Sequence, residues 1–347
     1  MSHLLSRRAF LSGAAGLAGG LVLARFADDA RAARTRARYD DLMTDDYLGE
    51  PRIETRIEGD AVFTEGPAVD RAGNVYFTNI PASKILRWDP RQKQLTVFRE
   101  NSHNANGLLF APNGDLLACE GATHRITRTD MRSGEVAVLA DSFEGVPLAP
   151  PNDLALDSQG RIYFSARPGA GAMDQKSPNA VYRLDPDGTL VRLLAAPDGT
   201  DMPNGLVTSP DDKRLYLIEA HPDADHLRNI RAFDLREDGS LANPRVLIDF
   251  YPGRSGDGMC IDAEANLYVA AGLHKTRDTS ETLDTKPGIH VISPEGKLLA
   301  YVATPEDTVT NCAFGGEDLR TLYITSGRAL CSVRTKIPGK PAYRPER

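Results

Sequence analysis

The stretch Gly73-Asn74-Val75-Tyr76-Phe77 joins a turn to an apolar, aromatic strand, and its recurrence decides the fold. Its five counterparts are Gly114-Asp115-Leu116-Leu117-Ala118, Gly160-Arg161-Ile162-Tyr163-Phe164, Lys213-Arg214-Leu215-Tyr216-Leu217, Ala265-Asn266-Leu267-Tyr268-Val269 and Leu319-Arg320-Thr321-Leu322-Tyr323-Ile324. Positions 76, 117, 163, 216, 268 and 323 mark the six copies, at intervals of 41, 46, 53, 52 and 55 residues. Such a period suits four short strands per unit, the length of a β-propeller blade.

A second strand-like segment follows most of these aromatic strands. It alternates apolar and polar residues and ends at a turn, as a half-buried strand does. The copies are Ile85 to Pro90, Ile126 to Asp130, Val181 to Pro186, Ile230 to Asp234 and Ile289 to Pro294. Long helical periodicity is absent, which excludes helix-rich folds.

Six such units must close into a ring, because an open stack would expose unpaired strand edges. The last unit has no outer strand of its own before a proline-rich and charged tail. The strand-like Arg52 to Ile57 can supply it, although this segment can also simply flank the first blade. We therefore predict an all-β, six-bladed β-propeller closed by an N-terminal strand.

The first 32 residues differ in composition from the rest. Ser6-Arg7-Arg8-Ala9-Phe10-Leu11 precedes an Ala/Gly-rich run from Gly13 to Leu23, too short to span a bilayer as a mature helix. This pattern indicates a twin-arginine signal peptide, with a cleavage site near Ala30-Arg31-Ala32. It predicts export to the periplasm by the Tat machinery, without a stable membrane anchor. The alternative is an N-terminal helix with two chance arginines.

The remaining chain divides into a linker or arm over 33–50, a catalytic propeller domain over 51–337 and a C-terminal tail over 338–347. A net charge of −7 and a charged fraction of 26% give no basic excess, so nucleic acid is excluded as a partner. The four cysteines lie in apolar strand-like segments without C-x-x-C spacing, at Cys119, Cys260, Cys312 and Cys331. Buried free thiols are favoured over disulfides, and zinc ligation by cysteine is improbable.

One oxygen-bearing residue stands upstream of each aromatic strand at nearly constant distance. The six are Glu65, Asn106, Asn152, Asn204, Asp257 and Asn311, which precede residues 76, 117, 163, 216, 268 and 323 by 11, 11, 11, 12, 11 and 12 positions. Each begins the innermost strand of its predicted blade. Because these strand starts surround the channel at one end of a closed propeller, we expect the six side chains to converge.

Carboxylate and amide oxygens without histidine or thiolate form a site for a hard cation. One divalent cation is predicted, with Ca²⁺ the best fit and Zn²⁺, Mn²⁺ or Mg²⁺ still open. Direct ligation is limited to about four residues, for which we choose Glu65, Asn152, Asn204 and Asp257. The alternative is that Asn-Gly and Asp-Gly pairs mark nothing more than turns.

Loops between the second and third strands of each blade leave at the same end and should form a pocket rim. The two longest are 166–179 and 272–287, and Asn79, Glu120, Arg167, Glu219 and His274 begin rim loops, where each can also be an ordinary solvated residue. We predict substrate contacts from Asn106, Glu120, Asn152, Arg167 and Asn311. No serine has a G-x-S-x-G setting, and the seven histidines show no ligand spacing, so covalent catalysis is disfavoured.

Several short motifs, in order, resemble the senescence marker protein, gluconolactonase and luciferin-regenerating enzyme family. They are Glu65-Gly66-Pro67, Phe77 to Pro81, Arg87-Trp88-Asp89, Pro151-Asn152-Asp153, Asn204-Gly205-Leu206, Asp257 to Asp262 and Phe314-Gly315-Gly316. The resemblance covers roughly residues 52 to 335. It implies that Glu65, Asn204 and Asp257 bind a divalent metal, that Asn152 contacts metal or substrate, and that Asp257 is the general base.

The resemblance also implies hydrolysis of a sugar-type lactone, as by a gluconolactonase. The metal would polarise the carbonyl while Asp257 activates water. Two positions depart from the family pattern where substrate would be held: Pro150 replaces an arginine of the animal members, and Ala166 to Ala170 replaces an Asp-Pro-Pro-Tyr-Gly run of bacterial ones. Two alternatives therefore stay open: a phosphotriesterase-like or other metal-dependent ester hydrolase, and a non-catalytic periplasmic ligand-binding propeller.

Overall fold

The computed structural model describes residues 38–168 and 177–340. The predicted signal peptide and part of the predicted rim loop over 166–179 lie outside the described residues. The chain divides into two compact units, Met1–Asp41 and Leu42–Arg347, each defined by the contacts among its own residues. The second unit contains every strand of the propeller.

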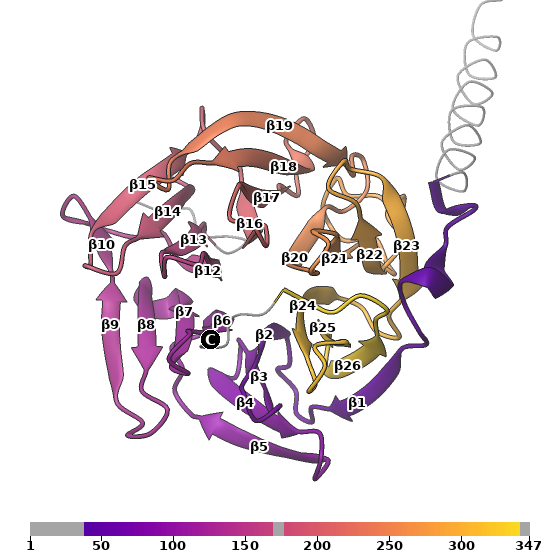
Figure 1. Cartoon of the computed structure of the whole chain (residues 1–347), viewed down its shortest axis with the longest axis horizontal. Helices are drawn as coiled ribbons and strands as arrows, with labels where there is room; N and C mark the ends of the chain where they lie inside the picture. The colour runs from indigo at the N-terminus through magenta and orange to yellow at the C-terminus, as the bar shows by residue number, and fades with distance from the viewer. Residues whose placement is uncertain (1–37, 169–176, 341–347) are drawn as a thin grey trace, which may run out of the picture. The chain divides into compact units, whose positions relative to one another are not determined.

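The propeller unit is a ring of six four-stranded antiparallel sheets around a central axis (Figure 1). From the axis outward, blade one is β2 (Thr64–Val69), β3 (Val75–Asn79), β4 (Lys84–Asp89) and β5 (Gln94–Arg99), and blade two is β6 (Ala105–Phe110), β7 (Leu116–Glu120), β8 (Arg125–Thr129) and β9 (Val136–Ala140). Blade three is β12 (Pro151–Leu156), β13 (Ile162–Ala166), β14 (Ala180–Leu184) and β15 (Leu190–Ala195), and blade four is β16 (Pro203–Thr208), β17 (Arg214–Ala220), β18 (Arg228–Leu235) and β19 (Leu241–Asp249). Blade five is β20 (Gly256–Ile261), β21 (Leu267–Ala271), β22 (Gly288–Ile292) and β23 (Leu298–Ala303).

Blade six takes its strands from both ends of the unit. It consists of β24 (Val309–Gly315), β25 (Thr321–Ser326), β26 (Ala329–Arg334) and, outermost, β1 (Arg52–Arg56). Strand β1 pairs antiparallel with β26, so that Arg52 faces Ser332 and Arg56 faces Ala329. The predicted six-bladed propeller and its closure by the N-terminal strand are therefore confirmed.

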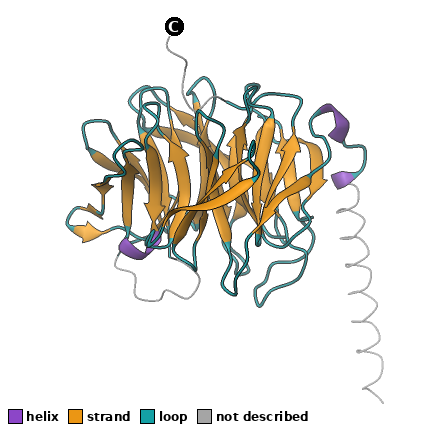
Figure 2. Cartoon of the chain, turned by 90° about the horizontal axis from the view of Figure 1, so that it is seen from below, coloured by secondary structure: helices purple, strands orange, loops and turns teal. Residues whose placement is uncertain are grey.

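The remaining described elements are short. They are the 3-10 turns η1 (Thr44–Asp46) and η2 (Gly121–Thr123) and the small hairpin of β10 (Ser142–Phe143) and β11 (Val146–Pro147). In side view the strands run between two loop-covered ends of the ring (Figure 2).

The recurring aromatic strand packs between neighbouring blades. All five residues of β3 are buried, and Tyr163, Tyr216 and Tyr268 are each 0% exposed. The ring of Tyr268 meets that of Phe314 edge to face with centroids 5.0 Å apart, which joins blade five to blade six. Each fully buried side chain of this size contributes about 1.5–3 kcal/mol. The repeat found in the sequence is thus the packing unit between blades.

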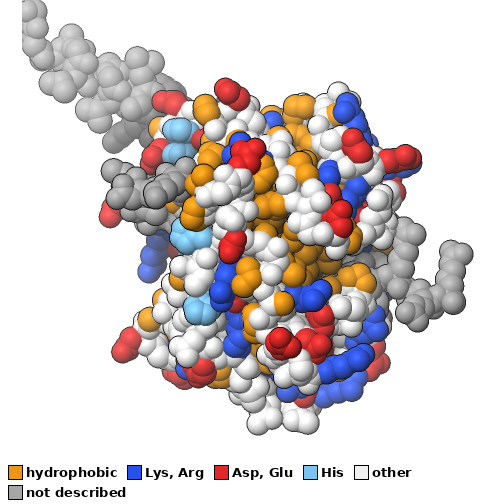
Figure 3. Space-filling view, turned by 90° about the vertical axis from the view of Figure 1, so that its left-hand side faces the viewer, with side chains coloured by type: hydrophobic (Ala, Val, Ile, Leu, Met, Phe, Trp, Pro, Cys, Tyr) orange, Lys and Arg blue, Asp and Glu red, His pale blue; other side chains and the backbone are white. Residues whose placement is uncertain are grey.

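All four cysteines are free thiols, as predicted. Cys119, Cys312 and Cys331 are buried, and Cys260 is half-buried with its Sγ 3.5 Å from Sγ of Cys312. Within the described ranges, no helix has the length and apolar character needed to cross a membrane. Figure 3 shows acidic and basic side chains interspersed on one side of the molecule, without a large patch of either sign.

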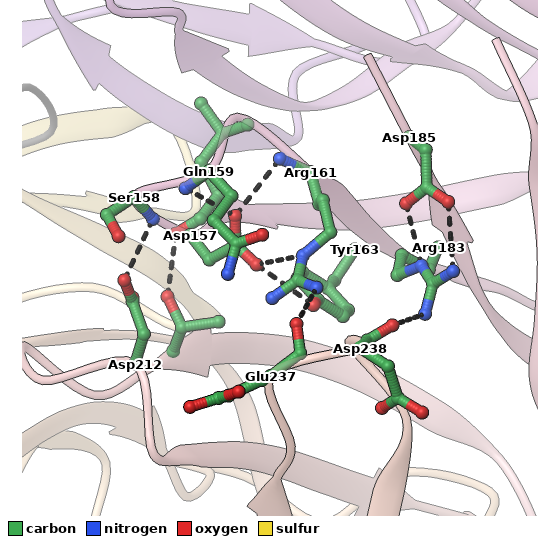
Figure 4. A network of polar contacts seen from close by, with 12 residues as sticks. Asp157, Ser158, Gln159, Arg161, Tyr163, Arg183, Asp185, Asp212, Glu237 and Asp238 are labelled. Carbon is green, nitrogen blue, oxygen red and sulfur yellow. Dashed lines mark hydrogen bonds and ion pairs between the residues drawn. The ribbon is translucent and has the colours of Figure 1, made fainter. Parts of the chain in front are cut away.

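A buried polar network joins blade three to blade four (Figure 4). The Asp157 carboxylate accepts from Arg161 Nε at 2.5 Å and from the Tyr163 hydroxyl at 3.0 Å. Arg161 also donates to the carbonyl of Glu237, in the turn between β18 and β19, at 2.7 Å. Asp157 and Arg161 are only 4% and 6% exposed, so each charge depends on its partners rather than on water.

Replacing Asp157 with alanine is expected to lower the free energy of unfolding by about 3–5 kcal/mol, because the buried Arg161 charge loses its counter-ion. Urea denaturation measures this change. Asp318→Ala is the matched control, since Asp318 pairs with Arg334 at the surface, where both side chains are about half exposed. The control should change stability by at most about 1 kcal/mol. Equal losses in both variants would show that the buried network has no special role.

Candidate functional site

The six innermost strands share an irregularity close to the predicted oxygen-bearing residues. Their pairing register shifts between residues 65 and 68, 105 and 108, 151 and 154, 203 and 206, 256 and 259, and 309 and 311. Asn106, Asn152, Asn204 and Asp257 lie within four of these bulges, while Glu65 and Asn311 are the last paired residues beside the other two. A bulge bends its strand and re-aims side chains. The constant spacing in the sequence therefore reflects a repeated bulge.

The glycines beside these residues allow the inner strands to approach one another closely. A Cβ on Gly205 would lie 2.7 Å from the carbonyl oxygen of Asp257, and one on Gly107 would lie 2.7 Å from Asp153 Oδ1. Both distances are too short for a side chain, so glycine is required at the contact between neighbouring blades. The alternative interpretation of the Asn-Gly and Asp-Gly pairs as turns is wrong, since they lie inside β6, β16 and β20.

Asp257 is held from two sides. Asn204 donates its side-chain amide to Oδ1 at 2.7 Å, and Arg254 forms a short ion pair with Oδ2. Arg254 is buried and also donates to the carbonyls of Gly272, at 3.2 Å, and Val309, at 3.0 Å. Sequence reasoning missed this arginine. Its signal was weak: one basic residue three positions before Asp257, in a segment otherwise made of small residues.

Two further carboxylates accompany Asp257. Glu65 is 4% exposed, and burial, together with the negative charges of Asp257 and Asp153, raises its pKa well above the ordinary value. Asp153 accepts from the Leu154 amide at 2.9 Å and from Asn311 Nδ2 at 3.0 Å. Burial, with a smaller effect from the charge of Asp257, raises the pKa of Asp153 to about 7. Asp153 was not among the predicted site residues.

This cluster fits a divalent cation. Three buried carboxylates interact through their charges, and Arg254 is in direct contact with only one of them. Glu65, Asn204 and Asp257 all take part in this electrostatic and hydrogen-bonding cluster, and Asn152 lies half-buried in the bulge of β12. Oxygen donors with excess negative charge suit a hard cation. As a ligand, Asn204 would have to offer its amide oxygen in place of the nitrogen that now donates to Asp257.

Among the predicted substrate residues, Arg167 is the one whose positive charge interacts with the carboxylates of this cluster. Its backbone amide donates to the carbonyl of Pro150 at 2.9 Å, so it lies at the end where β12 begins. Burial lowers the pKa of its guanidinium, and the carboxylates of Asp257 and Glu65 oppose this effect. Its Nε is buried and has no hydrogen-bond partner in the described part of the chain. A ligand oxygen in the channel can supply that partner.

Glu120 and Asn311 have side chains occupied by protein contacts. Glu120 is 0% exposed and accepts from Arg99 at 2.5 Å, Arg125 at 2.7 Å and Thr127 at 3.0 Å, which lower the pKa of its carboxyl against the effect of burial. Asn311 donates to Asp153 and accepts from the Cys312 amide at 2.8 Å. These hydrogen bonds satisfy the polar atoms of both side chains, so neither side chain needs a substrate as a partner.

Asn106 and the predicted rim residues differ in their burial and in how many hydrogen bonds their side chains already make. Asn106 is half-buried within the bulge of β6. Asn79 is buried and bonded to the backbone of Ala61 and Phe63, and Glu219 is buried and accepts from Thr200, Asp201, Met202 and Arg231. His274 is exposed, with its Nε2 3.1 Å from the carbonyl oxygen of Thr304. Among the predicted substrate residues, Asn106, Asn152 and Arg167 therefore have polar side-chain atoms that the contacts described here do not use.

A cavity of about 650 Å³ opens at the other end of the channel. It is lined by the ends of the inner strands, including Phe110, Met259 and Phe314, and by Lys340. Asp153 and Asn311 also line it, whereas Glu65, Asn204 and Asp257 do not. Glu65, Asn204 and Asp257 therefore lie outside this cavity, whereas Asp153 and Asn311 stand between it and the end where the inner strands begin.

Residues 63–328 match the SMP-30/gluconolactonase/LRE-like family. The chain is similar to a gluconolactonase of Zymomonas mobilis, at 29% identity over 82% of this chain and 81% of that protein. It is also similar to regucalcin of Xenopus laevis, at 29% identity over 74% of this chain and 80% of the relative. A solved structure of a gluconolactonase from Xanthomonas campestris superposes with a TM-score of 0.69 at 28% identity, over 84% of this chain and 91% of that one.

The fold and the site together define the class of protein: a six-bladed β-propeller with a buried acidic cluster on its axis. Since the family match covers most of the propeller, the chain belongs to the SMP-30/gluconolactonase/LRE-like family. The resemblance based on short motifs is thereby confirmed.

Proposed function

We propose that this protein is a hydrolase that opens a sugar-type lactone with the help of one divalent cation on the propeller axis. The observation that carries the proposal is the convergence of Glu65, Asn204 and Asp257, from three different blades, in one buried and negatively charged cluster. The similarity to proteins named gluconolactonase supports the reaction class.

The cation would be held by Glu65, Asn152, Asn204 and Asp257. Ca²⁺ is our first choice because the donors are all oxygens, with Zn²⁺, Mn²⁺ and Mg²⁺ as alternatives. When bound, such an ion supplies Lewis-acid polarisation of the lactone carbonyl and lowers the pKa of a water. It would also offset the repulsion among the carboxylates of Glu65, Asp153 and Asp257.

Asp257 is our candidate general base. A base must reach the proton of the attacking water with a free carboxylate oxygen. In the structure Asn204 and Arg254 each occupy one oxygen of Asp257. Cation binding would replace the contact with Asn204 at Oδ1, so the water proton would have to be accepted at Oδ2, beside Arg254. Arg254 then acts as a positioning residue, because it fixes the orientation of the carboxylate.

Arg167 and Asn106 would orient the substrate. The unpartnered Nε of Arg167 offers a donor next to the acidic cluster, where a lactone carbonyl or hydroxyl oxygen can accept. Asn106 offers both a donor and an acceptor from the bulge of β6, which suits sugar hydroxyl groups. Burial of this region excludes water from the reacting carbonyl and strengthens these interactions.

Purified protein reconstituted with cation is expected to open sugar lactones, with turnover lost on chelation and restored by one cation of the series. Proton release in weak buffer measures the rate against a panel of sugar lactones, aliphatic lactones and one phosphotriester. Faster turnover of the phosphotriester would favour the phosphotriesterase-like alternative. Bound cation with no turnover of any ester would favour a ligand-binding propeller, and turnover unaffected by chelator would remove the cation from the mechanism.

Asp257→Asn is expected to reduce turnover by about 10²- to 10⁴-fold, the usual contribution of a general base, while the amide keeps much of the cation affinity. Lactone turnover and calorimetric cation titration measure the two effects separately. Asp60→Asn is the control, since Asp60 is exposed and lies outside the cluster. Wild-type turnover in Asp257→Asn would exclude Asp257 as the base.

We also propose that the chain is exported to the periplasm by the Tat machinery through residues 1–32. This proposal is supported by the arginine pair Arg7-Arg8 ahead of the apolar run. The double substitution Arg7→Lys and Arg8→Lys should retain the protein in the cytoplasm, whereas Arg25→Lys should not. Fractionation of expressing cells followed by immunoblotting separates the two results, and periplasmic recovery of the double variant would refute the signal.

A further inference from the structure

We propose that Asp201, His221 and His226 form a second metal site, for a transition-metal dication such as Zn²⁺, on the rim of blade four. Each residue offers one ligand atom, and the three atoms lie within 4.8 Å of one another. Asp201 precedes β16, whereas His221 and His226 lie between β17 and β18, so only the fold brings the three together.

The donor set differs in chemical character from the axial cluster. Two imidazole nitrogens with one carboxylate oxygen suit zinc and its neighbours, whereas carboxylate and amide oxygens suit calcium or magnesium. Three protein ligands leave a fourth tetrahedral position for water. The protein would thus hold two metals of different class at separate places.

The contact between His226 and Asp201 is already close to the geometry of two ligands on one ion. Nδ1 of His226 lies 3.0 Å from each carboxylate oxygen of Asp201. Two ligand atoms bound to tetrahedral zinc at about 2.0 Å are separated by about 3.3 Å. Replacing the shared proton with a cation therefore requires only a small adjustment of these side chains.

The two imidazole rings lie face to face. Their planes lie 9° apart with centroids separated by 3.6 Å. Because an imidazole nitrogen binds a metal in the plane of its ring, at least one of the two rings has to rotate before both can bind one ion. Nδ1 of His221 accepts the backbone amide of Asp223 at 3.1 Å, so Nε2 is the nitrogen that can bind a metal without breaking this bond.

Buried charged residues fix the backbone on both sides of the cluster. Arg228, which is 1% exposed, donates to the carbonyl oxygens of His221 at 2.8 Å, Pro222 at 2.7 Å and Asp223 at 2.9 Å. Glu219 accepts from the amide of Asp201 at 3.1 Å. The ligands therefore stand on a preorganised support, which lowers the entropic cost of assembling a metal site.

Zinc binding to the purified full-length protein tests the site, by competition with a chromophoric chelator and by elemental analysis after gel filtration. The wild type is expected to bind one more equivalent of zinc than His226→Ala, or to bind it at least tenfold more tightly. The tetrahedral absorption spectrum of Co²⁺ in place of zinc gives a readout that does not depend on activity, and it should be lost in Asp201→Asn. His274→Ala, at another exposed rim histidine, should behave as the wild type.

The same titration in the Asp257→Asn background separates the two sites, because the rim equivalent of zinc should persist there whatever happens on the axis. The thermal transitions of His226→Ala and Asp201→Asn, whose ligand side chains are at least partly exposed, verify that both variants fold. Unchanged zinc stoichiometry and affinity in both variants would overturn the proposal. Zinc binding by the wild type only at millimolar concentration, as at an adventitious surface site, would overturn it as well.

Discussion

Close approach of six inner strands around one axis is the constraint on which the rest of the structure depends. Gly107 and Gly205 stand where a side chain would collide with the neighbouring blade, and each inner strand carries a bulge at nearly the same point. The same approach brings Glu65, Asp153 and Asp257 within electrostatic reach in a buried space. The close packing of the inner strands thus produces both the closed ring and the acidic site.

The propeller could be predicted from the sequence because each blade repeats the same local pattern. The repeat position occupied by Tyr268 in blade five and by Tyr323 in blade six holds tyrosine or leucine in every copy. Its side chain must fill the space between two sheets. Closure by Arg52–Arg56 was also predictable, because the last repeat lacks one strand. Bulges were not predictable from pattern alone: an Asn-Gly pair has the same composition in a turn and in a bulge.

The site was predictable only as far as it follows the repeat. Glu65, Asn204 and Asp257 occur in register, and the register predicted their convergence. Asp153 and the Asp201, His221 and His226 cluster lie outside the register and owe their roles to contacts between separate segments of the chain. Arg254 pairs with Asp257 only three positions away, but no feature of the repeat marks it. Glu120 occupies a suitable rim position, but two arginines from its own blade and its neighbour hold its carboxylate. Position in the repeat cannot reveal such partners.

The pairing of β1 with β26 has a consequence for how the molecule is made. Arg52 and Ser332, which hydrogen-bond across this pair, are 280 positions apart in the chain. A growing polypeptide can complete its first five blades from local segments, yet its ring stays open until the final strands have left the ribosome. Contacts of such long sequence separation form slowly. The first strand must therefore stay unpaired until β26 has been synthesised, and the ring closes only then.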